Sequence, residues 1–284
     1  MISAPLRLFL LGALTMSAFA ANSLLNRAAL ADGSIDPMSF ALLRVLAGAV
    51  VLWLLVREAP GLARGPLFMA AALCTYLLGF SLAYVALDAG IGALILFGTV
   101  QVTMLSGALV SGERLGARRW LGAALALAGL AALMLPGVEA VPAAGPAALM
   151  LLAGLGWGLY SLAGRGAARP LAVTAGNFLL AVPMVALLAL VWWCFGGDAT
   201  SSRRGVALAL VSGAVTSGLG YALWYAILPA LGAVRAGVAQ LSVPVIALLG
   251  GVALLGERLG AGALMASALL LAGVALASLP ARRG

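Results

Sequence analysis

The sequence contains ten apolar stretches of roughly 20 residues, separated by short connectors rich in charge, glycine or proline. A helix of about 20 residues crosses a hydrocarbon core of about 30 Å and satisfies its own backbone hydrogen bonds there. The alternating pattern of membrane β-strands is missing, and 64% hydrophobic against 8% charged residues excludes a soluble domain. We therefore predict an all-α polytopic membrane protein with ten transmembrane helices, at about 5–27, 37–56, 66–87, 90–111, 118–135, 146–164, 171–193, 205–226, 232–255 and 262–279.

A hexamer, Gly-Glu-Arg-Leu-Gly-Ala, occurs twice in the chain, at 112–117 and again 144 residues later at 256–261. Further matches follow at the same offset, since Leu127-Ala128-Gly129 recurs as Leu271-Ala272-Gly273. A sequence that repeats at half its length indicates duplication, and duplicated units usually form pseudo-symmetric structures.

The repeat divides the chain into two units of five helices each, residues 1–140 and residues 141–284. Because five is an odd number, the second unit must enter the bilayer upside down relative to the first. Inverted repeats give a protein two nearly equivalent packings, one open to each side of the membrane.

The first apolar stretch imitates a signal peptide, with Arg7 before a short apolar run and the small-residue triplet Ala18-Phe19-Ala20. The apolar residues continue to about Ala31, however, and cleavage would leave unequal repeats. We therefore interpret this stretch as the first transmembrane helix.

Arginine predicts the orientation, because the chain contains no lysine. With the N-terminus in the cytoplasm, ten arginines fall on the inner side, four on the outer side and two (Arg44 and Arg235) within spans. This distribution obeys the positive-inside rule and predicts an inner-membrane protein with both termini cytoplasmic. The net charge of +8 is thereby explained by topology, and no basic stripe indicates nucleic-acid binding.

The chain resembles EamA-type members of the drug/metabolite transporter superfamily in four motifs. Each unit has Gly-Glu-Arg-Leu after its fourth span, and the other motifs are Pro37-x6-Arg44, 154–161 (Gly-Leu-Gly-Trp-Gly-Leu-Tyr-Ser) and 241–245 (Leu-Ser-Val-Pro-Val). The resemblance covers essentially the whole chain. It implies a ten-helix transporter that exports metabolites, with a cavity lined by spans 1, 3, 4, 6, 8 and 9.

Arg44 lies within the second span, seven residues after Pro37 and therefore about 10 Å along the helix. An unpaired guanidinium at such depth costs about 2–3 kcal/mol. Asn177 occupies the matching position seven residues after Pro170. Two interpretations stay open: Arg44 snorkels or binds carbonyl groups to hold the helices together, or it meets an anionic group such as a substrate carboxylate.

Polar and aromatic side chains recur at helical spacing on several spans, which predicts a central cavity because amides facing lipid would lack hydrogen-bond partners. For single aromatic residues, an interfacial belt or helix packing is the alternative, and Tyr84 and Tyr225 near span ends fit the belt best. The candidate substrate-binding residues are Asn22, Arg44, Tyr76, Phe80, Gln101, Trp157, Tyr160, Tyr221, Trp224 and Gln240.

The charged residues of the two hexamers have a structural interpretation. Glu113 and Glu257 precede spans 5 and 10, where a carboxylate can meet the positive end of a helix. Arg114 and Arg258 can then act as headgroup anchors. Direct contact of these residues with substrate is the alternative.

The chain has no histidine, and every Asp and Glu falls at or beyond the end of a predicted span. Proton- or sodium-coupled carriers usually place a carboxylate near the midplane, so we predict facilitated or exchange transport. No Cys/His cluster or Ser/His/Asp set indicates a metal site or an intramembrane enzyme. We expect no catalytic activity, cofactor or metal.

These features predict a transporter of a small organic metabolite, such as an amino acid or a related amphipathic solute. Its partners would be that solute and the lipid bilayer. The oligomeric state, monomer or homodimer, is left open. The alternatives are a carrier of bases, sugars or lipid-linked compounds, and a membrane scaffold or assembly protein that transports nothing.

Overall fold

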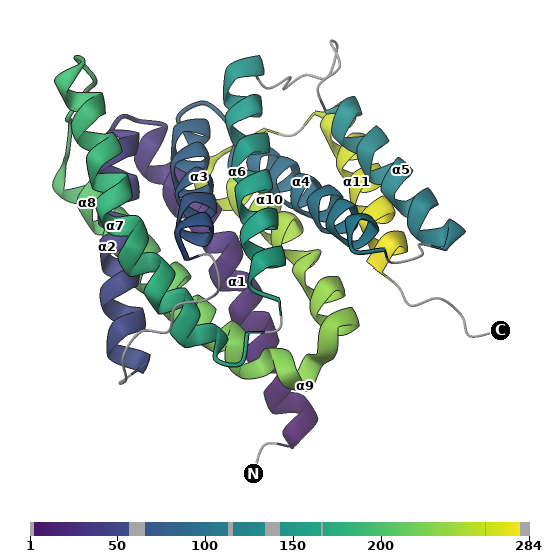
Figure 1. Cartoon of the computed structure of the whole chain (residues 1–284). Coiled ribbons are helices and arrows are strands. Elements are labelled where there is room, and N and C mark those ends of the chain that lie inside the picture. Colours follow the sequence, from purple (N-terminus) through teal and green to yellow (C-terminus); the bar gives the residue numbers. More distant parts are fainter. Residues whose placement is uncertain are drawn as a thin grey trace.

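The computed structural model describes residues 3–56, 66–112, 116–133, 143–165, 167–258 and 260–278, and these residues form helices without a strand (Figure 1). The helices are α1 (Ala4–Leu30), α2 (Pro37–Val56), α3 (Pro66–Tyr84), α4 (Ala89–Val110), α5 (Ala117–Ala132), α6 (Ala144–Ala163), α7 (Pro170–Cys194), α8 (Arg203–Val211), the π-helical stretch η1 (Ser212–Leu219), α9 (Gly220–Gln240), α10 (Ser242–Leu255) and α11 (Ala261–Ser278).

Seven helical segments in the described part of the chain are long and apolar enough to cross a membrane. Ser242–Leu255 and Ala261–Ala277 are apolar but shorter. Large apolar side chains such as Phe9, Val110 and Phe195 are exposed on the outside of the molecule, which suits contact with lipid acyl chains. The protein is therefore a multi-pass membrane protein.

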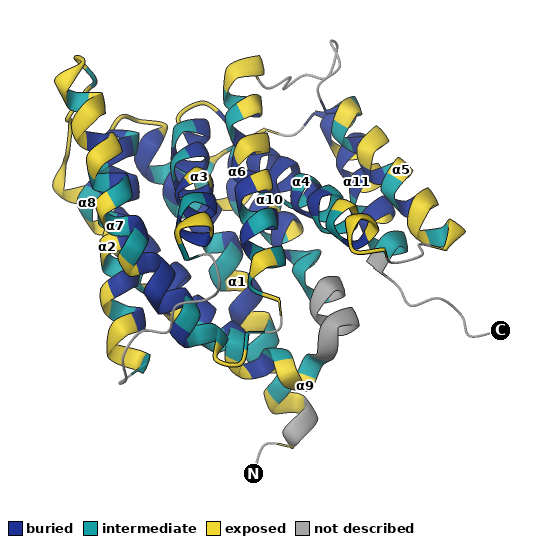
Figure 2. Cartoon of the chain, viewed as in Figure 1, coloured by how far each residue is buried: buried dark blue, intermediate teal, exposed yellow. Residues whose placement is uncertain are grey.

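The helices surround α1, which contacts α3, α4, α8, η1, α9 and α10. In Figure 1 the pair α5 and α11 forms one edge of the molecule, and α2, α7 and α8 form the opposite edge. The buried side chains lie where helices face one another, whereas exposed side chains follow the outer faces (Figure 2).

The structure differs from the prediction of two separate helices for the eighth and ninth spans. α8, η1 and α9 follow one another without an intervening loop from Arg203 to Gln240, although α9 contains Pro229 and its ribbon changes direction (Figure 1), and the helix is interrupted at Leu241. Pro244 accounts for the break, because its ring clashes with the carbonyl group four residues earlier and it has no N–H to donate there. The break leaves Gln240 at the end of a helix.

α5 and α11 touch through glycines of the repeated sequence. A β-carbon at Gly129 would collide with the backbone nitrogen of Leu270, and a β-carbon at Gly273 with the backbone nitrogen of Ala126. Small residues permit such close approach of helices in membranes. The two contacts are reciprocal, because each partner is shifted by the same 144 residues as the hexamers.

Candidate functional site

A central cavity of about 730 Å³ lies among the helices, with α4, α5, α6, α7, α9 and α11 contributing lining residues. It extends from the buried Tyr160, Tyr221 and Trp224 to the exposed Arg119 and Arg165. Arg119 follows the beginning of α5 and Arg165 follows the end of α6, so the cavity reaches the surface near these two helix ends. We call this side of the molecule the Arg165 end.

One wall of the cavity is aromatic. The indole of Trp157 on α6 stacks on Tyr160, with ring centroids 5.4 Å apart, and on Tyr221 of α9, with centroids 5.3 Å apart. Phe19 of α1 contacts Tyr221 and Trp224 edge-on. The wall thus presents flat apolar faces, with hydroxyl and N–H groups at their edges.

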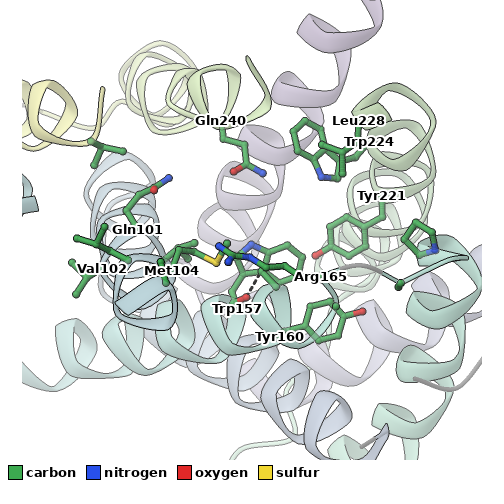
Figure 3. A pocket seen from close by; sticks show the side chains of 18 of the residues that line it. Gln101, Val102, Met104, Trp157, Tyr160, Arg165, Tyr221, Trp224, Leu228 and Gln240 are labelled. Carbon is green, nitrogen blue, oxygen red and sulfur yellow. Dashed lines mark hydrogen bonds between the residues drawn. The ribbon is translucent and has the colours of Figure 1, made fainter. Parts of the chain in front are cut away.

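Two glutamines supply amide groups to the cavity. Gln101 comes from the middle of α4, and Gln240 from the C-terminal end of α9. In the view of Figure 3, Gln240 and Trp157 lie on opposite sides of the cavity, and Gln101 and Tyr221 lie between them on either flank. Neither glutamine side chain hydrogen-bonds another side chain or backbone group in the described part of the chain, so both amides are available to a ligand.

A second, smaller cavity of about 30 Å³ adjoins the first. Trp157, Tyr221 and Gln240 line both cavities, so the two spaces share a wall. All ten candidate residues from the sequence line one cavity or the other: Gln101, Trp157, Tyr160, Tyr221, Trp224 and Gln240 line the larger, and Asn22, Arg44, Tyr76 and Phe80 join the shared residues in the smaller.

Arg44 is completely buried beside the smaller cavity. Its Nε donates to Ser217 Oγ at 3.2 Å, and its Nη2 donates to the Tyr76 hydroxyl at 2.7 Å. The guanidinium carbon lies 5.1 Å from the ring centroids of both Tyr76 and Phe80, within the range of cation–π attraction. Arg44 does not snorkel toward the end of its helix, because these contacts hold it inside the bundle.

The π-helical stretch η1 faces this cluster. Ser212 and Thr216 donate to Asn22 Oδ1 at 2.8 and 3.1 Å, while Ser217 accepts from Arg44. Asn22 Nδ2 in turn donates to the Tyr76 hydroxyl at 3.2 Å. A π turn widens the helix and turns side chains toward a site that regular α-geometry would not reach. Sequence patterns give no signal for this stretch.

Asn177, the counterpart of Arg44, is also fully buried on α7. Its Nδ2 donates to the Tyr160 hydroxyl at 3.4 Å and its Oδ1 has no partner. Arg44 and Asn177 thus each bond a tyrosine that lines a cavity.

At the other side of the molecule, a group of charged residues joins four helix ends. Arg27 of α1 donates to the carbonyl groups of Tyr84 and Val85, at 3.4 and 3.1 Å, and to Asp88 Oδ1 at 3.2 Å. Its Nε lies 3.7 Å from Glu257 Oε1, which accepts a hydrogen bond from Ala89 N at 2.7 Å. We call Arg27, Asp88 and Glu257 the clamp, and this side the Arg27 end.

The clamp connects the two halves of the chain at a half-buried position. Burial raises the pKa of the Glu257 carboxyl above its ordinary value. The hydrogen bond from the Ala89 N–H lowers this pKa, the nearby Asp88 carboxylate raises it further, and the positive charge of Arg27 lowers it. No clamp residue lines either cavity. The clamp therefore links helix ends on the side of the molecule away from the cavity opening.

The structure corrects parts of the sequence interpretation around this clamp. The prediction that Glu257 meets the positive end of a helix is confirmed, but that helix is α4 of the first half, not the span that follows Glu257. The assignment of Tyr84 to an interfacial belt is wrong, because Tyr84 is fully buried and donates to Ala89 O at 3.1 Å. Arg27 is one of the four arginines on the predicted outer side, and the sequence indicates no contact for it. Glu113 and Arg114 lie outside the described residues.

Among the described residues, no group of three or more His, Cys, Asp or Glu side chains is placed to hold a metal ion. The cavities offer flat aromatic faces, amides, hydroxyl groups and one buried guanidinium.

Comparisons with known proteins agree with this arrangement. The model of the EamA-like transporter family matches residues 145–279. An uncharacterized protein of Pseudomonas aeruginosa, PA1977, is 53% identical over 277 residues, which cover 96% of this chain and 95% of that protein. One crystal structure superimposes with a TM-score of 0.67 at 19% identity, covering 95% of this chain and 97% of the other, and so shares its fold. The chain belongs to the EamA-like transporter family, within the drug/metabolite transporter superfamily.

Proposed function

We propose that the protein carries a small organic metabolite, an amino acid or a related amphipathic solute, out of the cell by alternating access. The observation that supports this most is a cavity that reaches the surface at the Arg165 end, while the clamp links the helix ends at the Arg27 end. A carrier caught with its site facing one compartment has this arrangement. The direction of transport follows from the resemblance to metabolite exporters of the family.

The pattern of helix contacts supports two inverted units, residues 1–140 and 141–284. In such a repeat, α1 corresponds to α6, α2 to α7, α3 to α8 with η1, α4 to α10, and α5 to α11. Three contacts then have counterparts: α3 with α6 matches η1 with α1, α3 with α7 matches η1 with α2, and α4 with α6 matches α10 with α1. The reciprocal glycine contacts of α5 and α11 fit the same relation.

Inverted units predict that the two hexamers lie on opposite sides of the membrane. Ser111, next to the first hexamer, and Arg258, within the second, are both exposed. In a variant whose Cys74 and Cys194 are replaced by serine, Ser111→Cys should react with an impermeant maleimide only after the cells are opened. Arg258→Cys should react in intact cells. Labelling of both positions from the same side would contradict the inverted repeat and the inner-membrane orientation with cytoplasmic termini.

The lining of the cavities supports an amphipathic solute. Aromatic faces bind apolar surface, while the amides of Gln101 and Gln240 bind polar groups that would otherwise lose their hydrogen bonds. Among the described residues, no Asp or Glu lines either cavity, and this favours facilitated or exchange transport. A strict requirement for an imposed proton gradient would contradict that part of the proposal.

Counterflow into proteoliposomes tests the proposal. Vesicles preloaded with one unlabelled solute from a panel of amino acids, other carboxylates, bases and sugars should accumulate its labelled form. Gln101→Leu and Gln240→Leu should each raise KM by about three- to thirtyfold, because losing one or two ligand hydrogen bonds costs about 1–2 kcal/mol. Thr75→Val on an exposed face of α3 is the matched control and should transport like the native protein.

The outcomes separate the candidate functions. Counterflow confined to bases or sugars would favour the alternative substrate classes. Absence of counterflow with every solute would favour a membrane scaffold. Unchanged KM values in both glutamine variants would remove the cavity as the binding site.

A further inference from the structure

Arg44 carries a buried positive charge that no carboxylate balances. A guanidinium is always protonated in proteins, and buried charges are normally paired. None of the described Asp and Glu side chains forms an ion pair with Arg44, and its Nη1 has no hydrogen-bond partner although the side chain is fully buried. Because two neighbouring rings and Ser217 fix the other guanidinium atoms, the direction of Nη1 is fixed as well.

A second unused donor lies beside the first. The Tyr76 hydroxyl accepts two hydrogen bonds, from Arg44 Nη2 and from Asn22 Nδ2. A hydroxyl has two acceptor positions and one proton to donate. Both acceptor positions are therefore filled, and the proton has no acceptor within the described structure. The cluster thus offers two donors and a positive charge.

The small cavity that Arg44 and Tyr76 line fits a planar anionic group. Its volume of about 30 Å³ accommodates about two water-sized atoms when one needs 10–15 Å³. A carboxylate has two oxygens, one for each of the two unused donors, and a hydrogen bond from a guanidinium to a carboxylate is strengthened by the opposite charges. One guanidinium balances one negative charge, which favours a monocarboxylate over a phosphate ester.

We propose that Arg44 and Tyr76 form a carboxylate-binding subsite, so that the transported solute is an organic monocarboxylate. This inference rests on the proposed transport function and assigns its substrate class. The small cavity holds only the carboxylate, and the rest of the solute extends into the larger cavity along Trp157, Tyr221 and Gln240, which line both spaces. The solute is thus anionic at one end and apolar or aromatic at the other.

Benzoate is a suitable probe, because it has a carboxylate on an aromatic ring, and benzamide is its uncharged isostere. We expect benzoate at millimolar concentration to bind the purified native protein at least about tenfold more tightly than benzamide, as measured by calorimetry at constant ionic strength. Arg44→Gln should abolish this preference, and Tyr76→Phe should reduce it severalfold. Arg204→Gln, which changes an exposed arginine at the Arg27 end, should leave it unchanged.

Arg44→Lys provides a second variant in case Arg44→Gln does not fold. It keeps the positive charge but not the planar guanidinium group, and it should retain a weakened preference for benzoate. Equal binding of benzoate and benzamide by the native protein would overturn the subsite without any variant. Equal Arg44-dependent binding of chloride and benzoate would also overturn it, because the cluster would then be a general anion site.

The experiment separates this inference from the transport proposal. Counterflow of neutral solutes with no preference for carboxylates would overturn the subsite and leave the carrier intact. Arg44-dependent benzoate binding without counterflow of any solute would support the subsite and overturn the carrier.

Discussion

Replacing Trp157 with alanine is expected to weaken substrate affinity by about ten- to a hundredfold, because loss of a central aromatic anchor costs about 2 kcal/mol or more. The indole stacks on Tyr160 and Tyr221 and lies 5.1 Å from the ring of Tyr76. It also belongs to both cavities, so its removal alters the surface that orients the solute between them. The measurement is the KM of counterflow in proteoliposomes that contain equal amounts of monodisperse protein.

Two further variants define this effect. Trp157→Phe keeps a stacking ring and should remain within severalfold of the native KM. Trp120→Ala removes a tryptophan that is 52% exposed on α5 and lines neither cavity, so it should change nothing. A native KM in Trp157→Ala would show that the aromatic wall does not bind the solute.

Replacing Arg27 with methionine is expected to open the Arg27 end. The change keeps the apolar stem and removes every contact of the clamp that involves the guanidinium, including those to Asp88 and Glu257. Loss of a single charge-assisted hydrogen bond costs about 1.5–3 kcal/mol, which shifts an opening equilibrium tenfold or more. Ser23, buried one turn before Arg27 and lining the smaller cavity, reports the change.

The readout is the rate at which Ser23→Cys reacts with an impermeant maleimide applied from outside, without other cysteines. This rate should rise at least about tenfold in Arg27→Met. Arg204→Met is the matched control: it breaks an exposed ion pair with Asp32 at the same end, and exposed pairs contribute only about 0–1 kcal/mol. Equal rates in Arg27→Met and the native background would show that the clamp does not hold this end closed.

The polar candidate residues could be selected from the sequence because lipid imposes a strong rule. Polar groups such as Asn22, Arg44 and Gln101 cannot face acyl chains without a large cost, so they turn toward one another or toward an enclosed space. All ten candidates line a cavity for this reason. Their role in binding stays a prediction.

The contacts of residues near helix ends could not be predicted in this way, because water and lipid headgroups there permit several arrangements of a polar side chain. Arg27 and Arg204 look alike in the sequence, yet one joins four helix ends and the other forms an exposed pair. Likewise, only the rotation of α3 decides whether Tyr84 reaches the interface or the interior. The π-helical stretch was also unpredictable, since it depends on packing between segments far apart in the chain.

The unbalanced guanidinium of Arg44 has an electrical consequence. Arg44 is a buried cation within a candidate membrane span, and moving one full charge across a potential of 100 mV changes its energy by about 2.3 kcal/mol. A carboxylate bound at the proposed subsite would cancel that charge. Membrane potential should therefore bias the reorientation of the empty carrier and have little effect on the loaded one, which makes the return step sensitive to the energetic state of the cell.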